Sequence, residues 1–149
     1  PVLADVEVVD EGTRSLAALA TELVAPARSI CALAETSDPA AAVLTLAAAP
    51  SPFPIPGGQR TVIATVGKDG SHGARTGDTV ACHVPAAACE VRDTTGCGDH
   101  YHAGFLTALS RGLSGLPEAM SFATRVAAAK AETPGPVVSG DALERFQLL

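Results

Sequence analysis

Apolar residues recur at every third or fourth position along several stretches of this chain, which predicts amphipathic helices. The first predicted helix covers residues 13–24 and is broken by Pro26. The second covers Pro39–Ala48, where Asp38 supplies a cap and proline occupies the first helical position. Further helices are predicted at residues 99–111, from Pro117 to Pro134, and from Asp141, as its cap, to Phe146. In the helix at 99–111 the expected inward positions are Phe105, Leu106 and Leu109, with Gly112 at its end.

Runs of β-branched and apolar residues predict strands between these helices. Residues 60–66 read R-T-V-I-A-T-V, which is apolar on both faces, as in a buried parallel strand. A short strand is predicted at Val2–Ala4, and two weaker ones at Gly73–Arg75 and Thr79–Val84. Residues 50–58, with Pro52 among their four prolines, predict a loop. This alternation predicts an α/β fold in which helices flank a mostly parallel sheet.

Size and charge narrow the classes of protein that fit. The 149 residues are enough for one domain with a core, which we expect to cover residues 1–149. The formal net charge of -6 leaves no basic stripe to neutralise nucleic-acid phosphates. No apolar run reaches the roughly 18 residues that a membrane helix needs. We therefore expect neither a nucleic-acid partner nor a membrane partner.

The cysteines and the first residues bear on the compartment and on completeness. Four cysteines match no zinc motif: Cys31, Cys82, Cys89 and Cys97. Reduced thiols in a cytoplasmic protein are the expectation, since nothing resembles a signal peptide, and a disulfide between Cys82 and Cys89 is the alternative. The sequence opens at Pro1, not Met, directly in a strand-like run, so we expect a portion of a longer protein.

Asp93–Asp99, D-T-T-G-C-G-D, is the stretch that carries the clearest chemistry. Two glycines flank a small residue where a loop becomes a helix, which lets successive backbone N–H groups point at one anion. The positive end of the helix dipole adds to that attraction. A carboxylate directly after such a loop suits a base in phosphoryl transfer. A plain helix-capping turn with Asp99 as a capping residue is the alternative interpretation.

Three motifs in order resemble the ribokinase-like (PfkB) carbohydrate kinases. D-T-T-G-C-G-D-H-Y-H-A-G-F-L (93–106) is similar to the family's C-terminal signature. T-V-G-K-D-G (65–70) looks like its turn beside the nucleotide, and residues 118–135 resemble the helix and loop that close over the adenine. The resemblance implies a layered α/β/α ribokinase-like fold, here its C-terminal nucleotide-binding and catalytic portion, without the N-terminal sugar-binding part and lid. The nearest members in motif are fructokinase- and ketohexokinase-like.

The resemblance also implies a role for each matching position. Asp99 would be the general base that takes the proton from a primary hydroxyl of the sugar. Asp93, with the loop at Pro134–Gly135, would bind a monovalent cation such as K⁺, and a role for Asp93 in capping the turn stays open beside it. ATP would bring Mg²⁺, held largely by phosphates and water. The expected anion hole is Gly96, Cys97 and Gly98, and the expected nucleotide-binding residues are Thr65, Gly67, Gly70 and Thr124.

Departures from the family pattern keep several points open. The N-x-x-E pattern linked to magnesium is absent at Ala27–Ile30, whereas Asp5 and Glu7 either assist a metal or lie in a solvated turn. His100 either tunes Asp99 or simply occupies a helix face.

The function implied is ATP-dependent phosphorylation of a primary alcohol of a sugar, a ketose or a related carbohydrate. A nucleoside or vitamin kinase of the same fold, and a truncated fragment that binds nucleotide without turnover, are the alternatives. The full-length protein would form a homodimer.

Overall fold

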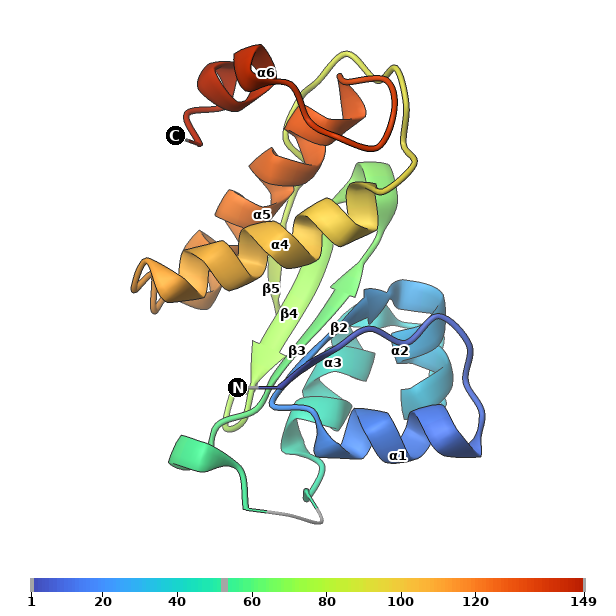
Figure 1. Cartoon of the computed structure of the whole chain (residues 1–149). Coiled ribbons are helices and arrows are strands. Elements are labelled where there is room, and N and C mark those ends of the chain that lie inside the picture. The colour runs from blue at the N-terminus through green and yellow to red at the C-terminus, as the bar shows by residue number, and fades with distance from the viewer. Residues whose placement is uncertain (1, 52–53, 149) are drawn as a thin grey trace. The chain divides into compact units, whose positions relative to one another are not determined.

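A five-stranded sheet with the strand order β1-β2-β3-β4-β5 forms the framework of the structure (Figure 1). The structure is a computed structural model, and it describes residues 2–51 and 54–148. Strands β1 and β3 both pair in parallel with β2, whereas β4 is antiparallel to β3. The sheet is therefore mixed, and the predicted α/β class is confirmed. The strands are Leu3–Ala4 (β1), Glu22–Pro26 (β2), Thr61–Thr65 (β3), Ser71–Arg75 (β4) and Cys82–Val84 (β5).

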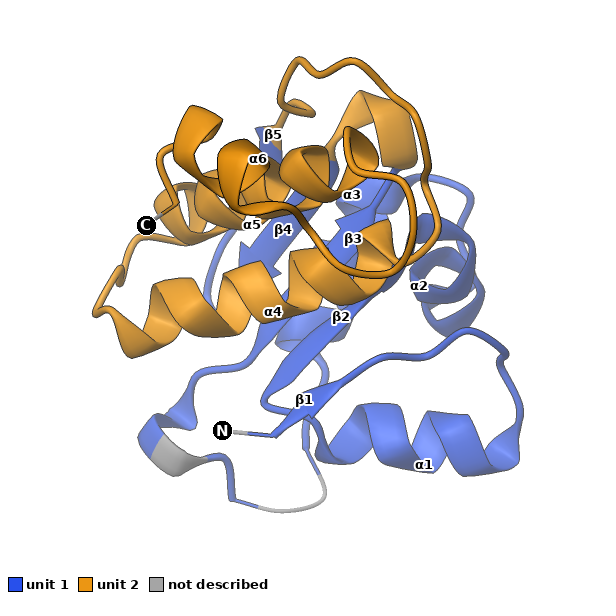
Figure 2. Ribbon diagram, turned by 45° about the horizontal axis from the view of Figure 1, so that its top comes forward, with its two compact units in different colours: residues 1–66, 71–83 blue, residues 67–70, 84–149 orange. Residues whose placement is uncertain are grey.

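Contacts within the chain divide it into two compact units (Figure 2). Unit 1 consists of Pro1–Val66 and Ser71–His83, and unit 2 consists of Gly67–Gly70 and Val84–Leu149. Unit 1 contains α1 (Glu11–Leu19), α2 (Ala27–Ala34), α3 (Pro39–Ala48) and a 3₁₀ turn at Pro56–Gly58. Unit 2 contains a 3₁₀ turn at Gly67–Asp69, α4 (Cys97–Ser110), α5 (Leu116–Ala131) and α6 (Gly140–Arg145). The single domain expected over residues 1–149 stays a prediction.

The N-terminal helix predicted over residues 13–24 is wrong beyond Leu19. The helix begins at Glu11, where Asp10 and Thr13 form a reciprocal capping box, and ends at Leu19. Residues 22–26 instead form β2, in which Leu23, Val24 and Ala25 are fully buried. Pairing with strands on both sides outweighs the weak helical spacing of these residues. The chain then enters α2, which the sequence analysis did not predict.

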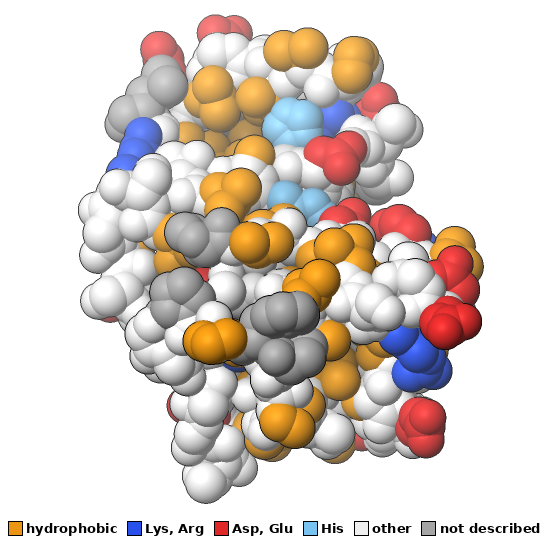
Figure 3. Space-filling view, turned by 60° about the horizontal axis from the view of Figure 1, so that its bottom comes forward, with side chains coloured by type: hydrophobic (Ala, Val, Ile, Leu, Met, Phe, Trp, Pro, Cys, Tyr) orange, Lys and Arg blue, Asp and Glu red, His pale blue; other side chains and the backbone are white. Residues whose placement is uncertain are grey.

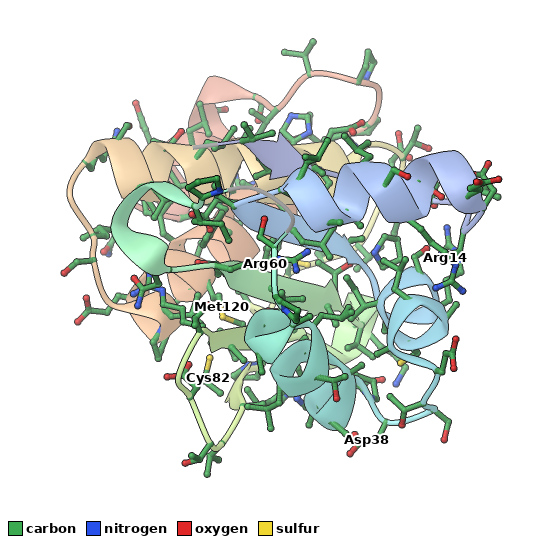
Figure 4. All side chains as sticks on the ribbon, turned by 90° about the horizontal axis from the view of Figure 1, so that it is seen from below. Arg14, Asp38, Arg60, Cys82 and Met120 are labelled. Atoms are coloured by element: carbon green, nitrogen blue, oxygen red, sulfur yellow. The ribbon has the colours of Figure 1, made fainter. Side chains whose placement is uncertain are left out.

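Arg60 joins two helices of unit 1 from inside the core. Only 3% of the residue, which is labelled in Figure 4, is exposed. Its guanidinium donates to the carbonyls of Ala17 and Leu46. Those carbonyls lie in the last turns of α1 and α3, which carry no basic residue of their own. Burial lowers the pKa of Arg60. These carbonyls also accept from the N–H groups of Ala20 and Ala49 at 3.3 Å, so Arg60 adds a second hydrogen bond at each helix end.

Helix α3 follows its prediction closely. It spans Pro39–Ala48, and the Asp38 side chain accepts from the N–H of Ala40 at 3.0 Å. The predicted loop after it contains Pro52, which lies outside the described residues.

Helices α4 and α5 form the core of unit 2 and cross at a glycine. A Cβ on Gly104 would lie 2.8 Å from the Cα of Ala123, so only glycine permits this approach. Phe105 on α4 and Met120 on α5 are fully buried. The predicted inward position of Phe105 is therefore confirmed. Leu106, also predicted to face inward, is 42% exposed, so that prediction is wrong.

The C-terminal helix departs from its prediction in the cap. The Ser139 hydroxyl accepts from the N–H of Ala142 at 3.2 Å, so Ser139 and not Asp141 caps α6. Asp141 lies one residue into the first turn, where its charge still suits the helix dipole.

The surface carries mixed chemistry. Apolar side chains lie among acidic and basic ones on the face drawn in Figure 3.

No single described helix has the length and apolar character to cross a membrane. Helices α2 and α3, with a bend of 57° between them, are long and apolar enough only when taken together. All four cysteines are free thiols in the structure, and the reduced state of the protein stays a prediction. The exposed large hydrophobic residues are Val2, Val8, Leu16, Leu19, Val80, Val91, Leu106 and Val137.

Candidate active site in the Gly96–Asp99 loop

The start of α4 is built on Gly96. This residue caps the helix with a φ of +78° and a ψ of 5°, in the left-handed region that favours glycine. Its own carbonyl accepts from the N–H of His100 at 3.0 Å and bonds the His100 ring nitrogen Nδ1 at 2.9 Å. The sharp turn at Gly96 therefore directs the next amides out of the helix end.

The three amides predicted to form an anion hole are not equivalent. The N–H of Cys97 donates to the carbonyl of Thr94 at 3.2 Å, so it is engaged within the loop. In the described part of the chain, no acceptor is bonded to the N–H of Gly96 or Gly98. These two groups stand at the positive end of a 14-residue helix, where an anion is favoured.

Asp99 occupies the first turn of α4 and is exposed to solvent. A Cβ placed on Gly96 would lie 3.9 Å from Asp99 Oδ2 and 3.8 Å from His100 Nδ1. The carboxylate thus stands directly beside the glycine loop, as the base interpretation requires. The contact made by His100 is with the Gly96 carbonyl, so His100 secures the loop.

Asp93 ties the beginning of this loop to a second loop after α5. Its Oδ1 accepts from the N–H of Thr95 at 2.9 Å, and its Oδ2 accepts from the N–H of Gly135 at 2.9 Å. These two hydrogen bonds, with a smaller contribution from the Lys130 charge, lower the pKa of Asp93 to about 2. The sequence analysis named both loops, and the structure brings them together through this carboxylate.

Lys130 is a residue of the site that the sequence analysis missed. It lies on α5, is fully buried, and donates from Nζ to the carbonyls of Asp93 at 3.2 Å and Thr133 at 3.1 Å. Its Nζ is also 3.9 Å from Asp93 Oδ2, and its Cε would be 4.0 Å from a Cβ on Gly96. The sequence signal for Lys130 is a lysine inside the apolar run A-A-A-K-A. A lysine buried by such a run needs charged or carbonyl partners.

Cys97 contributes its backbone and not a reactive thiol. Burial raises the pKa of the Cys97 thiol, outweighing the opposite effect of Lys130. The thiolate is the nucleophilic form of cysteine, so this thiol is a poor nucleophile at neutral pH. Burial also raises the thiol pKa of the other three cysteines: Cys31, Cys82 and Cys89.

The residues predicted to bind nucleotide lie on separate elements. Thr65 is the last residue of β3 in unit 1, paired with Pro26 and Ser71. Gly67 and Gly70 begin and close the turn that belongs to unit 2, with φ of +57° and +91°. Thr124 lies on α5 and is 8% exposed.

The positions considered for a metal make other contacts. Glu7 forms an ion pair with Arg28, and its backbone carbonyl accepts from the Ser29 hydroxyl at 3.1 Å. Over residues 2–51 and 54–148, no three His, Cys, Asp or Glu side chains gather so that they could hold a metal ion.

Comparison with known proteins supports the family assigned from the motifs. The model of the pfkB family of carbohydrate kinases matches residues 8–142. No curated protein sequence matches the chain.

Several solved structures that are similar to this chain are kinases. One is aminoimidazole riboside kinase from Salmonella enterica, complexed with aminoimidazole riboside and an ATP analogue, with a TM-score of 0.72 and 27% identity over 98% of this chain and 52% of that one. Another is ribokinase from Thermotoga maritima, with a TM-score of 0.70 and 22% identity over 98% of this chain and 48% of that one. Adenosine kinase from Sinorhizobium meliloti has a TM-score of 0.67 and 28% identity over 86% of this chain and 36% of that one. The chain thus spans about half, or less, of the length of these structures, and the ribokinase-like fold is confirmed for the portion it represents.

Proposed function

Since the chain belongs to the pfkB family of carbohydrate kinases, we propose that it is the catalytic and nucleotide-binding portion of an ATP-dependent kinase acting on a primary hydroxyl of a sugar. The observation that carries the proposal is the arrangement at the start of α4. The exposed carboxylate of Asp99 stands beside the unengaged N–H groups of Gly96 and Gly98. Phosphoryl transfer needs a positioned base and donors for the charge on the transferred group, and this segment offers both.

In the proposed reaction the hydroxyl oxygen of the sugar attacks the γ-phosphorus of ATP. The hydroxyl proton passes to Asp99 as the new O–P bond forms. The bond between the γ-phosphorus and the β–γ bridging oxygen breaks, and its electron pair leaves with ADP. The N–H groups of Gly96 and Gly98, with the helix dipole of α4, stabilise the charge on the equatorial oxygens. The Cys97 amide would join them only by releasing the Thr94 carbonyl.

The nucleotide would lie along the turn at Gly67–Gly70 and near Thr124. Mg²⁺ bound to ATP supplies charge neutralisation of the phosphates, and the chain's own residues would position them. A cytoplasmic location and a homodimer of the full-length protein remain part of the proposal.

Two substrate classes are weighed within this function. The motif resemblance favours a ketose or a related carbohydrate. A riboside or nucleoside is the second candidate, because the Salmonella aminoimidazole riboside kinase and the Sinorhizobium adenosine kinase share 27% and 28% identity with this chain. A vitamin kinase and a fragment that binds nucleotide without turnover are further alternatives.

The test is ADP release from ATP with a panel of ketoses, aldoses, ribosides and nucleosides. We expect turnover with one class, and a loss of about 100-fold or more in kcat in Asp99→Asn, since a positioned base contributes about 10²–10⁴-fold. Asp141→Asn is the matched control, because Asp141 is also an exposed aspartate in the first turn of a unit 2 helix.

Each outcome has a distinct meaning. Turnover that survives Asp99→Asn would refute the role of Asp99 as base. If the chain binds ATP in calorimetry but turns over no substrate, the non-catalytic alternative holds for this portion. If it binds no ATP, the nucleotide-binding proposal fails for this chain.

A further inference from the structure

The buried ammonium group of Lys130 is surrounded by oxygen atoms in the manner of a bound cation. Its two hydrogen-bond acceptors are the backbone carbonyls of Asp93 and Thr133, and the Asp93 carboxylate lies 3.9 Å away. Carbonyl and carboxylate oxygens are also the ligands that a monovalent cation such as K⁺ binds. A charged lysine is rarely fully buried unless such partners compensate it.

The same two segments are those from which a monovalent cation site was expected. Asp93 begins the glycine loop, and Thr133 directly precedes Pro134–Gly135. The oxygen atoms there already have partners from the chain. Both carboxylate oxygens of Asp93 accept backbone N–H groups, and the Ala131 carbonyl accepts from Arg92 and Asp93 at 2.8 and 3.1 Å. The residues present do not fit an added K⁺.

Charge reinforces this geometric argument. A second positive charge a few ångströms from the Lys130 ammonium would be repelled by it. We propose that the Lys130 ammonium takes the place of a bound monovalent cation between the Asp93 and Thr133 segments, so that this chain binds no K⁺ there.

The consequence for the site is a positive charge that is part of the chain. Lys130, at the C-terminal end of α5, donates a hydrogen bond to the carbonyl of Asp93, three residues before Gly96. It therefore holds the loop in position whatever salt is present. The inference has two consequences. Turnover that does not depend on K⁺ is a consequence that rests on the proposed function. The absence of K⁺ binding does not rest on it.

The first experiment compares thermal unfolding of the full chain in KCl, NaCl and choline chloride at one ionic strength, followed by circular dichroism. We expect the same Tm in all three salts. Equilibrium dialysis with Tl⁺, which serves as a K⁺ analogue, should find no stoichiometric site. A ligand that binds the folded chain raises its Tm, so a Tm that is higher in KCl than in the other salts would overturn the proposal.

The second experiment removes the ammonium. Lys130→Ala should unfold at a lower Tm than the wild type in choline chloride, and KCl should restore at least about 4 °C of the loss. The variant should also bind one Tl⁺ per chain. Lys68→Ala is the control, since Lys68 is the other lysine of the sequence and its side chain is 90% exposed.

The outcomes separate this inference from the kinase proposal. A folded Lys130→Ala chain that neither gains stability from KCl nor binds Tl⁺ would show that the position is no cation site, and would overturn the inference. If that variant does not fold in any salt, the wild-type comparison of KCl with choline chloride still decides. Neither readout involves ATP or a sugar, so a failure of the kinase assay leaves both intact.

Discussion

Replacing Gly70 by alanine tests the backbone geometry of the turn after β3. The φ of Gly70 is +91°, and a Cβ on it would lie 2.0 Å from the carbonyl oxygen of Val84 and 2.8 Å from the nitrogen of Ala86. These neighbours are backbone atoms, which cannot rotate away as the end of a flexible side chain can. Alanine must therefore displace the segment at 84–86 or open the turn.

The expected magnitude has two parts. A left-handed backbone costs an L-residue about 1–2 kcal/mol. Overpacking against fixed atoms typically adds about 1–3 kcal/mol. Gly70→Ala should thus destabilise the fold by roughly 2–5 kcal/mol. Gly112→Ala is the matched control in the same unit, because Gly112 has a φ of +78° with nothing within 4 Å of its Cβ position, and should lose only about 1–2 kcal/mol.

The assay is guanidinium-induced unfolding followed by far-ultraviolet circular dichroism, since the chain has no tryptophan to report by fluorescence. The free energies of unfolding of wild type, Gly70→Ala and Gly112→Ala are compared at equal m-values. Equal losses in the two variants would refute the steric argument, because only the strain of positive φ would then be at work.

Two further predictions concern charges. Because the pKa of Asp93 is lowered from 3.8 to about 2, its carboxylate contributes stability that is complete above about pH 4 and is lost as the pH falls through about 2. Asp93→Asn should therefore flatten the pH dependence of the free energy of unfolding in that window. An unchanged pH dependence below pH 4 would contradict this prediction. Arg60→Ala should cost roughly 3 kcal/mol, since it removes two hydrogen bonds from a buried charged donor, whereas Arg28→Ala, at an exposed ion pair, should cost under about 1 kcal/mol. Guanidinium titrations measure both, and similar losses would count against the role of Arg60.

The sequence predicted best the elements whose signals are local. Asp38 and Pro39 define the start of α3, and residues 60–66 read as a strand because β3 consists of β-branched residues and alanine and is largely buried. Strand β2 escaped prediction because Leu23 fits both a helix face and a buried strand, and neither glycine nor proline separates it from α1. Only its pairing with β1 and β3, which joins distant parts of the chain, decides between the two.

The site divides in the same way. Asp93–Asp99 is one continuous stretch, so glycine spacing and a following carboxylate were enough to predict its place at a helix start. Lys130 is 37 residues from Asp93, and its burial depends on how α5 packs in unit 2. The engagement of the Cys97 amide by Thr94 is a detail of turn geometry that residue types do not specify.

The interleaving of the two units has a consequence for synthesis on the ribosome. Unit 2 takes Gly67–Gly70 from between two stretches of unit 1, and then resumes at Val84. Domains usually fold in order as the chain emerges. Here the N-terminal unit cannot be complete until His83 has left the exit tunnel, and by then the first four residues of the next unit have already appeared. A polypeptide starting at Val84 would lack Gly70 and its close approach to residues 84–86. No single cut in the sequence yields either unit whole.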